Sequence, residues 1–358
     1  MRHLLLAGGG HAHVEVLRRL ARQPLPGWRI TVLSREAKSP YSGMLPGVVA
    51  GLYRREEALI DLPALARRAQ ADLIVDSLAG VNAATQRALV ERGAPLGYDL
   101  LSVNTGARPD VTRVPGAAKY AIPLKPIDRL LTRLGNLAAG THVALVGAGA
   151  GGTEMAFALA MRMKVTLVAG AAGLLPGFPD AFRRAVRHAL SGRGITLTEG
   201  ENVAEVTRDA LLFPSAPAVP TQAVLWATGA APPDWIAASG LPRDEAGFLL
   251  VTETLRVVGQ DAIFAAGDIA GFGARALPKS GVHAVRQGPL LARNLRAAAA
   301  GGALTAYRPQ RDALILLSLA DGTAIGTRNG IVVHGRWVGR WKDWIDRRFM
   351  RRYAEEPA

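Results

Sequence analysis

Short apolar runs alternate with stretches of helical spacing along most of this chain. An apolar run at residues 3–7 precedes apolar positions spaced as in a helix over His11–Arg22, and a second apolar run follows at Arg29–Leu33. Parallel strands need a crossover connection, and a helix usually supplies it. The order strand, helix, strand therefore predicts a parallel sheet covered by helices.

The same pattern starts again near the middle of the chain. Val143–Val146 reads as a strand, Thr153–Met163 as a helix and Val165–Val168 as a strand. In each copy, short β runs follow, at Leu73–Val90 and at Ile195–Phe213, and they are typical of a small meander. A repeat on this scale predicts two domains of one architecture.

A glycine-rich loop stands between the first strand and the first helix of each copy. The first loop reads Gly-Gly-Gly-His-Ala-His over residues 8–13, and the second reads Gly-Ala-Gly-Ala-Gly-Gly over residues 147–152. In this position the glycines allow a tight turn and a close approach of the backbone to a pyrophosphate, which the helix N-terminus then faces. Two such loops favour two bound nucleotides, a flavin and a nicotinamide that exchange a hydride.

The predicted fold is therefore α/β, with two Rossmann-like nucleotide-binding domains, each with a β-meander, and a small C-terminal α+β domain. Two features indicate where the domains begin and end: a proline-rich linker at Pro109–Pro126 and a late apolar strand at Ala262–Ala266. We expect an FAD-binding domain at 1–110 and 230–300, an NAD(P)-binding domain at 111–229, and a C-terminal domain at 301–358.

The composition argues against several kinds of site and partner. The chain has 358 residues and no cysteine, which excludes disulfides, iron–sulfur clusters, cysteine-bound zinc and thiol catalysis. His11 and His13 diverge on a helix, so we predict no metal site. The formal net charge is +14, but the basic residues are scattered except at the C-terminus, and we predict no nucleic-acid partner.

A carboxylate follows the late apolar strand. Asp268 comes directly after Gly267 at the carboxyl end of Ile263–Ala266, the end that faces the ligand crevice of an α/β sheet. There it could accept hydrogen bonds from polyol hydroxyls. The alternative is that Asp268 caps the following turn.

These motifs together resemble one superfamily, the FAD-dependent pyridine nucleotide-disulfide oxidoreductases, which include the type II NADH dehydrogenases. Residues 8–13, 40–47 and 278–288 look like the subgroup often fused to selenophosphate synthase. The resemblance implies two sets of cofactor residues. The FAD set is Gly8, Gly10, His11, Ala12, Arg35, Tyr41, Met44, Thr105, Gly106, Gly267, Asp268 and Lys279. The NAD(P) set is Gly147, Gly149, Gly152, Glu154, Thr228 and Gly229.

The sequence departs from this family pattern at three places. His13 replaces the third glycine of the first loop, and Ser34 stands where an acidic residue usually binds the adenosine ribose. In the second domain, residues 169–171 are Ala-Gly-Ala, with neither an acid for NAD nor an arginine for NADP. The choice between NAD and NADP is therefore left open, as is whether the nicotinamide site is functional.

The resemblance also implies candidate catalytic residues. Lys279, His283 and Gln287 lie where type II NADH dehydrogenases place a segment that contacts the flavin and the quinone pocket. A lysine at the flavin edge would stabilise the reduced anion. The competing interpretations are a solvated loop charge for Lys279 and a packing role for His283. Lys125, in the linker, could reach the flavin edge or point to solvent.

The resulting functional hypothesis is an FAD-dependent oxidoreductase. It would pass a hydride from NAD(P)H through the flavin to a quinone-like acceptor, without cysteine chemistry. One alternative is an NAD(P)H-dependent reductase of a small redox protein, whose acidic surface the basic chain would attract. Another is a non-enzymatic FAD-binding partner in selenium metabolism.

The C-terminal helix has two interpretations. Trp337, Trp341, Trp344, Ile345 and Phe349 follow helical spacing among arginines. A basic helix with tryptophans suits an anionic membrane surface through residues 336–353. The alternative is docking on the flavin domain or on the partner of a homodimer. With neither a signal peptide nor a spanning segment expected, we predict a cytoplasmic protein, peripheral at the inner face of the membrane if the first interpretation holds.

Overall fold

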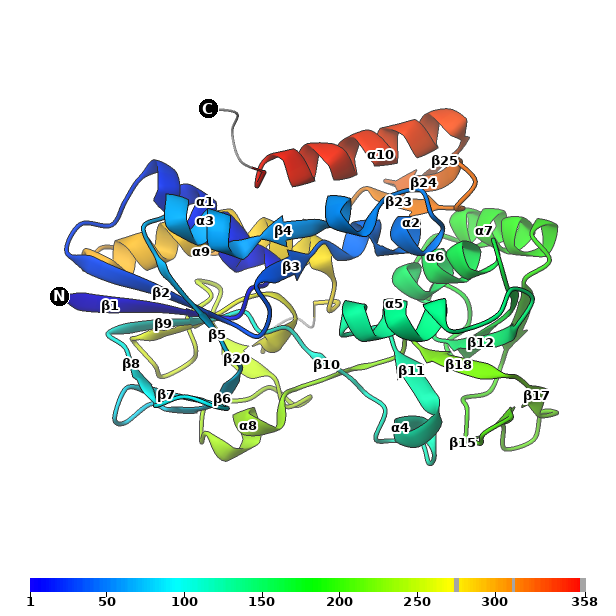
Figure 1. The fold of residues 1–358 in the computed structure, drawn as a ribbon, viewed down its shortest axis with the longest axis horizontal. Helices are drawn as coiled ribbons and strands as arrows, with labels where there is room; N and C mark the ends of the chain where they lie inside the picture. The colour runs from blue at the N-terminus through cyan, green and yellow to red at the C-terminus, as the bar shows by residue number, and fades with distance from the viewer. Residues whose placement is uncertain (274–276, 311–312, 355–358) are drawn as a thin grey trace.

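Two five-stranded parallel sheets form the centre of the protein in the computed structural model, which describes residues 1–273, 277–310 and 313–354 (Figure 1). The strand orders are β21-β9-β1-β2-β5 and β11-β18-β12-β13-β14, and all neighbours run parallel. The first sheet contains β1 (Arg2–Ala7), β2 (Trp28–Ser34), β5 (Asp72–Val75), β9 (Leu100–Val103) and β21 (Ile263–Ala265). The second contains β11 (Ala121–Pro123), β12 (His142–Val146), β13 (Lys164–Gly170), β14 (Thr196–Glu199) and β18 (Ala223–Trp226). The predicted α/β class with two parallel sheets is confirmed.

Each half also has its antiparallel meander, but the first run of each predicted meander was assigned wrongly. Those runs are β5 and β14, which complete the parallel sheets. The meanders consist of β6 (Leu78–Asn82), β7 (Arg87–Val90) and β8 (Leu96–Gly97), and of β15 (Glu205–Val206), β16 (Ala210–Leu212) and β17 (Val219–Pro220). A short apolar run does not carry the identity of its pairing partner, so the pattern could not separate the two arrangements.

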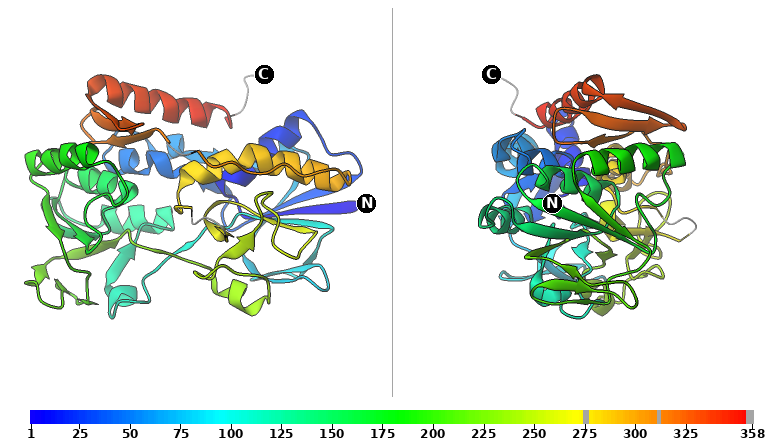
Figure 2. Two further views of the ribbon diagram at one scale, coloured as in Figure 1. Left: turned by 180° about the vertical axis from the view of Figure 1, so that it is seen from behind. Right: turned by 90° about the vertical axis from the view of Figure 1, so that its right-hand side faces the viewer.

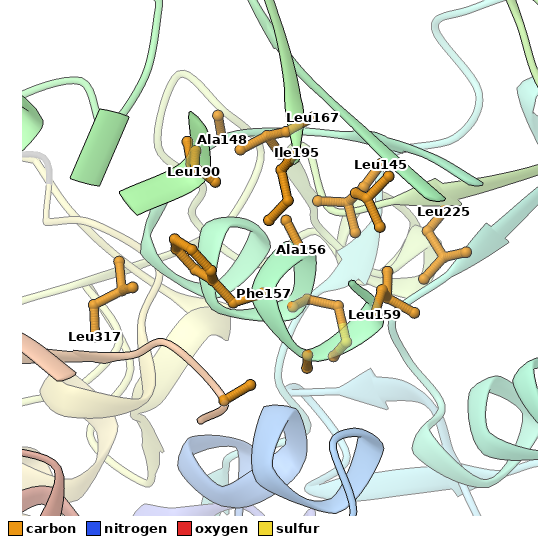
Figure 3. Packing of buried hydrophobic residues seen from close by; sticks show 14 of the residues in the cluster. Leu145, Ala148, Ala156, Phe157, Leu159, Leu167, Leu190, Ile195, Leu225 and Leu317 are labelled. Atoms are coloured by element: carbon orange, nitrogen blue, oxygen red, sulfur yellow. The ribbon is translucent and has the colours of Figure 1, made fainter. Parts of the chain in front are cut away.

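Helices cover both sheets. In the first half, α1 (His11–Arg22) packs against α9 (Gly281–Ala299) and α3 (Leu62–Arg68). The close contact depends on Gly288, because a Cβ there would lie 2.8 Å from Cβ of Glu15. In the second half, the sheet packs on α6 (Ala150–Leu159) and α7 (Asp180–Gly192), whose buried side chains include Phe157 and Leu190 (Figure 3). The other helices are α2 (Leu45–Val49), α4 (Ala117–Tyr120), α5 (Ile127–Gly135) and α8 (Asp234–Ala238).

The chain leaves and re-enters the first half at one place. β10 (Arg108–Pro109) pairs antiparallel with β19 (Ala230–Ala231), and β21 then adds the last strand to the first sheet. β10 and β19 thus lie at the predicted domain limits, which are 1–110 with 230–300, and 111–229. The remaining short strands are β3 (Lys38–Pro40), β4 (Leu59–Asp61), β20 (Leu249–Val251) and β22 (Ala270–Phe272).

The C-terminal segment joins the two halves. β23 (Ile315–Ser318), β24 (Ala324–Arg328) and β25 (Ile331–Gly335) form an antiparallel sheet, and α10 (Arg336–Arg351) lies across both halves (Figures 1 and 2). Leu317 belongs to the core of the second half, and Phe349 to that of the first. Within the described residues, no helix combines the length and the apolar character that crossing a bilayer requires.

Candidate functional site

The first glycine loop closes on Asn104, at the end of β9. Gly8 has a φ of +109°, and a Cβ on it would lie 2.4 Å from the carbonyl carbon of Asn104. Oδ1 of Asn104 accepts hydrogen bonds from the backbone N–H groups of Ala12 and His13, at 3.1 and 3.3 Å. Its Nδ2 donates to the carbonyl of Ala266 at 2.5 Å. One side chain thus joins the start of α1 to the end of β21.

Asn104 is a residue that sequence reasoning missed. It stands directly before Thr105 and Gly106, which the family resemblance did include among the FAD residues. Thr105 is exposed, and Gly106 has a φ of +76°. The available clue was its place at a strand end beside a predicted glycine loop, where a buried polar side chain must find partners.

His13 replaces the third glycine by making two buried hydrogen bonds. Its ring is fully buried, with Nδ1 2.7 Å from the carbonyl oxygen of Gly8 and Nε2 2.8 Å from Oγ of Ser102. Burial lowers the pKa of His13 to about 4, despite the opposing hydrogen bond to Gly8. The neutral ring therefore donates from Nδ1 to Gly8 and accepts from the Ser102 hydroxyl.

Asp268 and Gln287 meet at the carboxyl end of β21. Oε1 of Gln287, which is buried, accepts a hydrogen bond from the N–H of Gly267 at 2.6 Å. Oδ2 of Asp268 lies 3.5 Å from Nζ of Lys125, so the linker lysine reaches this strand end although its side chain is 52% exposed. Gln287 holds the backbone that presents Asp268, which makes it a positioning residue.

A ring cluster stands beside that ion pair. Burial lowers the pKa of His11 to about 4, and the charge of Lys125 adds to this effect. Tyr41 lies edge-on to His11 at 5.6 Å and stacks on Phe349 of α10 at 4.3 Å between ring centroids. Nε2 of His11 is buried and has no hydrogen-bond partner among the described residues. An unsatisfied nitrogen at this place fits a site that takes a polar ligand.

The other predicted flavin-site residues lie in varied surroundings. Nζ of Lys279 donates to the carbonyl of Ala270 at 2.7 Å and lies 3.7 Å from the ring centroid of Phe248. Nδ1 of His283 lies 3.4 Å from the hydroxyl of Tyr307. Met44 is buried, whereas Arg35 is exposed and pairs with Glu36. Among the predicted catalytic residues, Gln287 contacts the Gly267–Asp268 strand end.

The second glycine loop leaves room at its centre. Gly147 has a φ of +114°, and a Cβ on Gly152 would lie 1.9 Å from the carbonyl oxygen of Gly147, so both ends of the loop require glycine. A Cβ on Gly149 would meet no atom of the described chain within 4 Å. Thr228, which follows β18, lies beside the loop, whereas a Cβ on Gly229 would meet Asp110. The geometry fits a phosphate group approaching at Gly149.

The ribose position of the second half is neutral. The N–H of Ala171 donates to Oδ1 of Asn202 at 3.0 Å, and a Cβ on Gly170 would lie 2.5 Å from the same oxygen. An amide therefore occupies the place where an acid or an arginine would choose between NAD and NADP.

Glu154 turns away from the loop that precedes it and joins a buried charged cluster. Nζ of Lys342 lies 3.6 Å from Oε1 of Glu154 and 2.9 Å from Oδ2 of Asp346, and Tyr41 donates from its hydroxyl to Asp346 at 3.1 Å. Burial raises the pKa of Glu154 and of Asp346, against the effect of Lys342. Burial alone would lower the pKa of Lys342, but the two carboxylates outweigh it and raise this pKa.

This cluster borders a cavity of about 240 Å³ between the loop after β3 and α10. Its lining residues include Gly43, Gly47, Tyr53, Glu154 and Lys342. Across the part of the chain that the structure describes, no group of three or more metal-ligating side chains gathers here or elsewhere. The cavity thus offers an apolar rim, a tyrosine and a shared ammonium–carboxylate pair.

Comparisons with known proteins agree with this geometry. The family model described as pyridine nucleotide-disulphide oxidoreductase matches residues 2–288. The NADH dehydrogenase-like protein YutJ of Bacillus subtilis is 24% identical over 281 residues, which are 75% of this chain and 77% of that protein.

Two solved structures share the fold over nearly the whole chain. The sulfide:quinone oxidoreductase of Aquifex aeolicus has a TM-score of 0.82 at 16% identity, covering 99% of this chain and 91% of that one. The NDH2 of Plasmodium falciparum in complex with NADH has a TM-score of 0.80 at 14% identity, covering 98% of each chain.

Proposed function

This chain belongs to the pyridine nucleotide-disulphide oxidoreductase family, and on this premise we propose that it reduces a quinone-like acceptor with electrons from NAD(P)H. It is an FAD-dependent oxidoreductase. The family is named for a disulfide step, but the chain has no cysteine, so no thiol can form a mixed disulfide or attack a substrate.

The residues of the first site fit FAD. The loop of Gly8–Gly10 with the N-terminus of α1 would hold the pyrophosphate, and Asp268 would accept hydrogen bonds from the ribityl hydroxyls. Nε2 of His11, which is buried and unpaired among the described residues, would be available to a polar group of the cofactor. When bound, FAD supplies the two-electron chemistry between donor and acceptor, and the protein supplies orientation.

The assignment of a quinone-like acceptor rests on the cavity beside α10. Reduction of a quinone to a quinol consumes protons as well as electrons. Burial raises the pKa of Glu154 and Asp346, so these carboxyls hold protons at a higher pH than exposed ones. Tyr41 connects Asp346 to the ring cluster at the first site. We infer that the cluster of Glu154, Lys342, Asp346 and Tyr41 delivers protons to the acceptor.

The exposed face of α10 supports access to an acceptor dissolved in a membrane. Trp337, Trp341 and Trp344 are 55%, 37% and 49% exposed. Trp337 stacks on Trp341, and the guanidinium of Arg348 lies 5.0 Å from the ring centroid of Trp344. Tryptophans beside arginines suit the headgroup boundary of an anionic bilayer. We propose that this face rests on the membrane.

A second candidate rests on charge. With a net charge of +14, the chain would attract an acidic redox protein at low ionic strength. An NAD(P)H-dependent reductase of such a protein would need the same FAD and nicotinamide sites but not the proton-delivering cluster.

Anaerobic titration of the yellow, FAD-loaded protein with NADH and NADPH tests the proposal. We expect the flavin colour to bleach with the donor and to return with a soluble quinone analogue. Glu154→Gln should slow only the quinone-dependent step. Glu201→Gln is the control, at a half-buried carboxylate that accepts from the backbone N–H groups of Ser215 and Ala216, and it should not slow this step. Reoxidation by a ferredoxin-type protein but not by quinone would support the second candidate.

A further inference from the structure

A second and larger cavity lies outside both glycine loops. It has a volume of about 550 Å³ and is formed by one face of α9 and by the segment that follows this helix. Figure 2 shows this segment running alongside α9. The lining includes Arg286, Leu290 and Arg293 from the helix, and Tyr307, Arg308 and Gln310 from the segment.

Three guanidinium groups share this cavity. No acidic residue is among the described residues that line it. By contrast, Arg18 of α1 and Arg347 of α10 pair with carboxylates at 2.8 Å. Within residues 1–273, 277–310 and 313–354, no such pair forms at Arg286, Arg293 or Arg308. Arginine keeps its charge at every accessible pH, so the mutual repulsion persists until an anion binds.

The number and kind of the charges define the ligand. The planar fork of a guanidinium matches phosphate oxygens two at a time. A diphosphate ester carries roughly two to three negative charges near neutral pH, which balances three arginines. The volume lies within the range of roughly 300–1,000 Å³ found for small-molecule sites. Leu290 and the edge of Tyr307 provide apolar surface for the group that carries the phosphates.

We propose that the cavity between α9 and residues 305–310 binds a ligand through a diphosphate group, separately from the FAD and NAD(P) sites. Occupancy would reach the flavin end of α9, because Tyr307 lines the cavity and its hydroxyl lies 3.4 Å from Nδ1 of His283 in the first turn of the helix. Gln287, which holds Gly267, follows one turn later.

Isothermal titration calorimetry with inorganic pyrophosphate tests the site on the full-length, FAD-loaded protein. The variant is Arg286→Gln with Arg308→Gln. The matched control is Arg208→Gln with Arg328→Gln, which removes the same charge at two exposed positions elsewhere. We expect saturable binding whose affinity falls about tenfold or more in the variant and stays within about twofold of wild type in the control. FAD content and circular dichroism should match across all three proteins.

Two further titrations identify the source of the diphosphate. Binding of ADP that is weakened by the variant assigns a soluble nucleotide, whereas loss of affinity for vesicles that contain diacylglycerol pyrophosphate in the variant, without an effect on ADP, assigns a lipid headgroup. Equal weakening of pyrophosphate binding in variant and control would overturn the proposal, because general electrostatic attraction would then account for it. Absence of saturable binding to the wild type would overturn it as well.

Discussion

His13 should make the stability of the nucleotide-binding fold depend on pH. Burial lowers the pKa of this ring to about 4 in the folded protein, from about 6.5 in an unfolded chain. Between these two values the unfolded chain binds more protons than the folded protein, so acidification favours unfolding. The resulting loss of unfolding free energy is absent above about pH 7, and it reaches about 2 kcal/mol at pH 5 and about 3 kcal/mol below pH 4.

The His13→Gln substitution removes the titration but keeps a polar side chain. A glutamine can satisfy only part of the pattern that joins Gly8 to Ser102. We therefore expect the variant to lose about 1–2 kcal/mol at pH 7 and to show a shallower decline on acidification than the wild type. His13→Ala should cost about 2–4 kcal/mol, since it adds a cavity to the unsatisfied carbonyl and hydroxyl.

Urea unfolding followed by circular dichroism, with excess FAD at pH 7, 6 and 5, measures the difference. His188→Gln, at an exposed position of α7, is the matched control. Other groups also titrate in this range, so the informative quantity is the slope of the variant relative to the wild type. If the unfolding free energy fell equally steeply on acidification in wild type and His13→Gln, the assignment of a neutral ring with two hydrogen bonds would be refuted.

Three further predictions concern function. Asp268→Ala should yield protein with little bound FAD but near-native circular dichroism, because it removes a charged acceptor at a strand end; flavin released by denaturation measures this, and full FAD occupancy would contradict it. Alkylating agents should leave quinone-analogue reduction unchanged in a chain without thiols, and turnover of a disulfide substrate would oppose that expectation. Replacing Trp337, Trp341 and Trp344 together by serine should abolish sedimentation with anionic vesicles while flavin reduction by NAD(P)H persists; retained vesicle binding would remove the membrane role of this face.

The parts of the site that the sequence predicted are those set by backbone geometry. Gly8 and Gly147 occupy left-handed turns, and Gly152 packs on the carbonyl of Gly147. These requirements admit glycine and little else, so they leave a motif in the sequence. The place of Asp268 was predictable for a similar reason, because a strand end in a parallel sheet opens on the crevice.

The parts that the sequence did not reveal depend on partners far along the chain. Asn104 bonds to α1 and to Ala266, and Lys125 crosses from the linker to Asp268. Nothing in the local pattern around either residue specifies those partners. The family resemblance placed Glu154 among the NAD(P) residues, whereas its carboxylate contacts Lys342, which lies in the C-terminal helix.

The C-terminal helix shows how two structural roles can share one sequence pattern. Helical spacing grouped Trp337, Trp341, Trp344, Ile345 and Phe349, and docking and membrane binding competed as explanations. In the structure, Phe349 and Asp346 are buried against Tyr41, while the tryptophans remain exposed on the other side. The helix therefore docks on the first half of the chain. This packing also fixes the position of the exposed tryptophans relative to the cluster of Glu154, Lys342, Asp346 and Tyr41. Deleting α10 would remove the contacts of Phe349 and Asp346 with Tyr41 together with the tryptophans. Truncation would therefore disturb both roles of the helix at once. Substitution of the exposed tryptophans alone can test membrane contact while the packing of Phe349 and Asp346 on Tyr41 is kept.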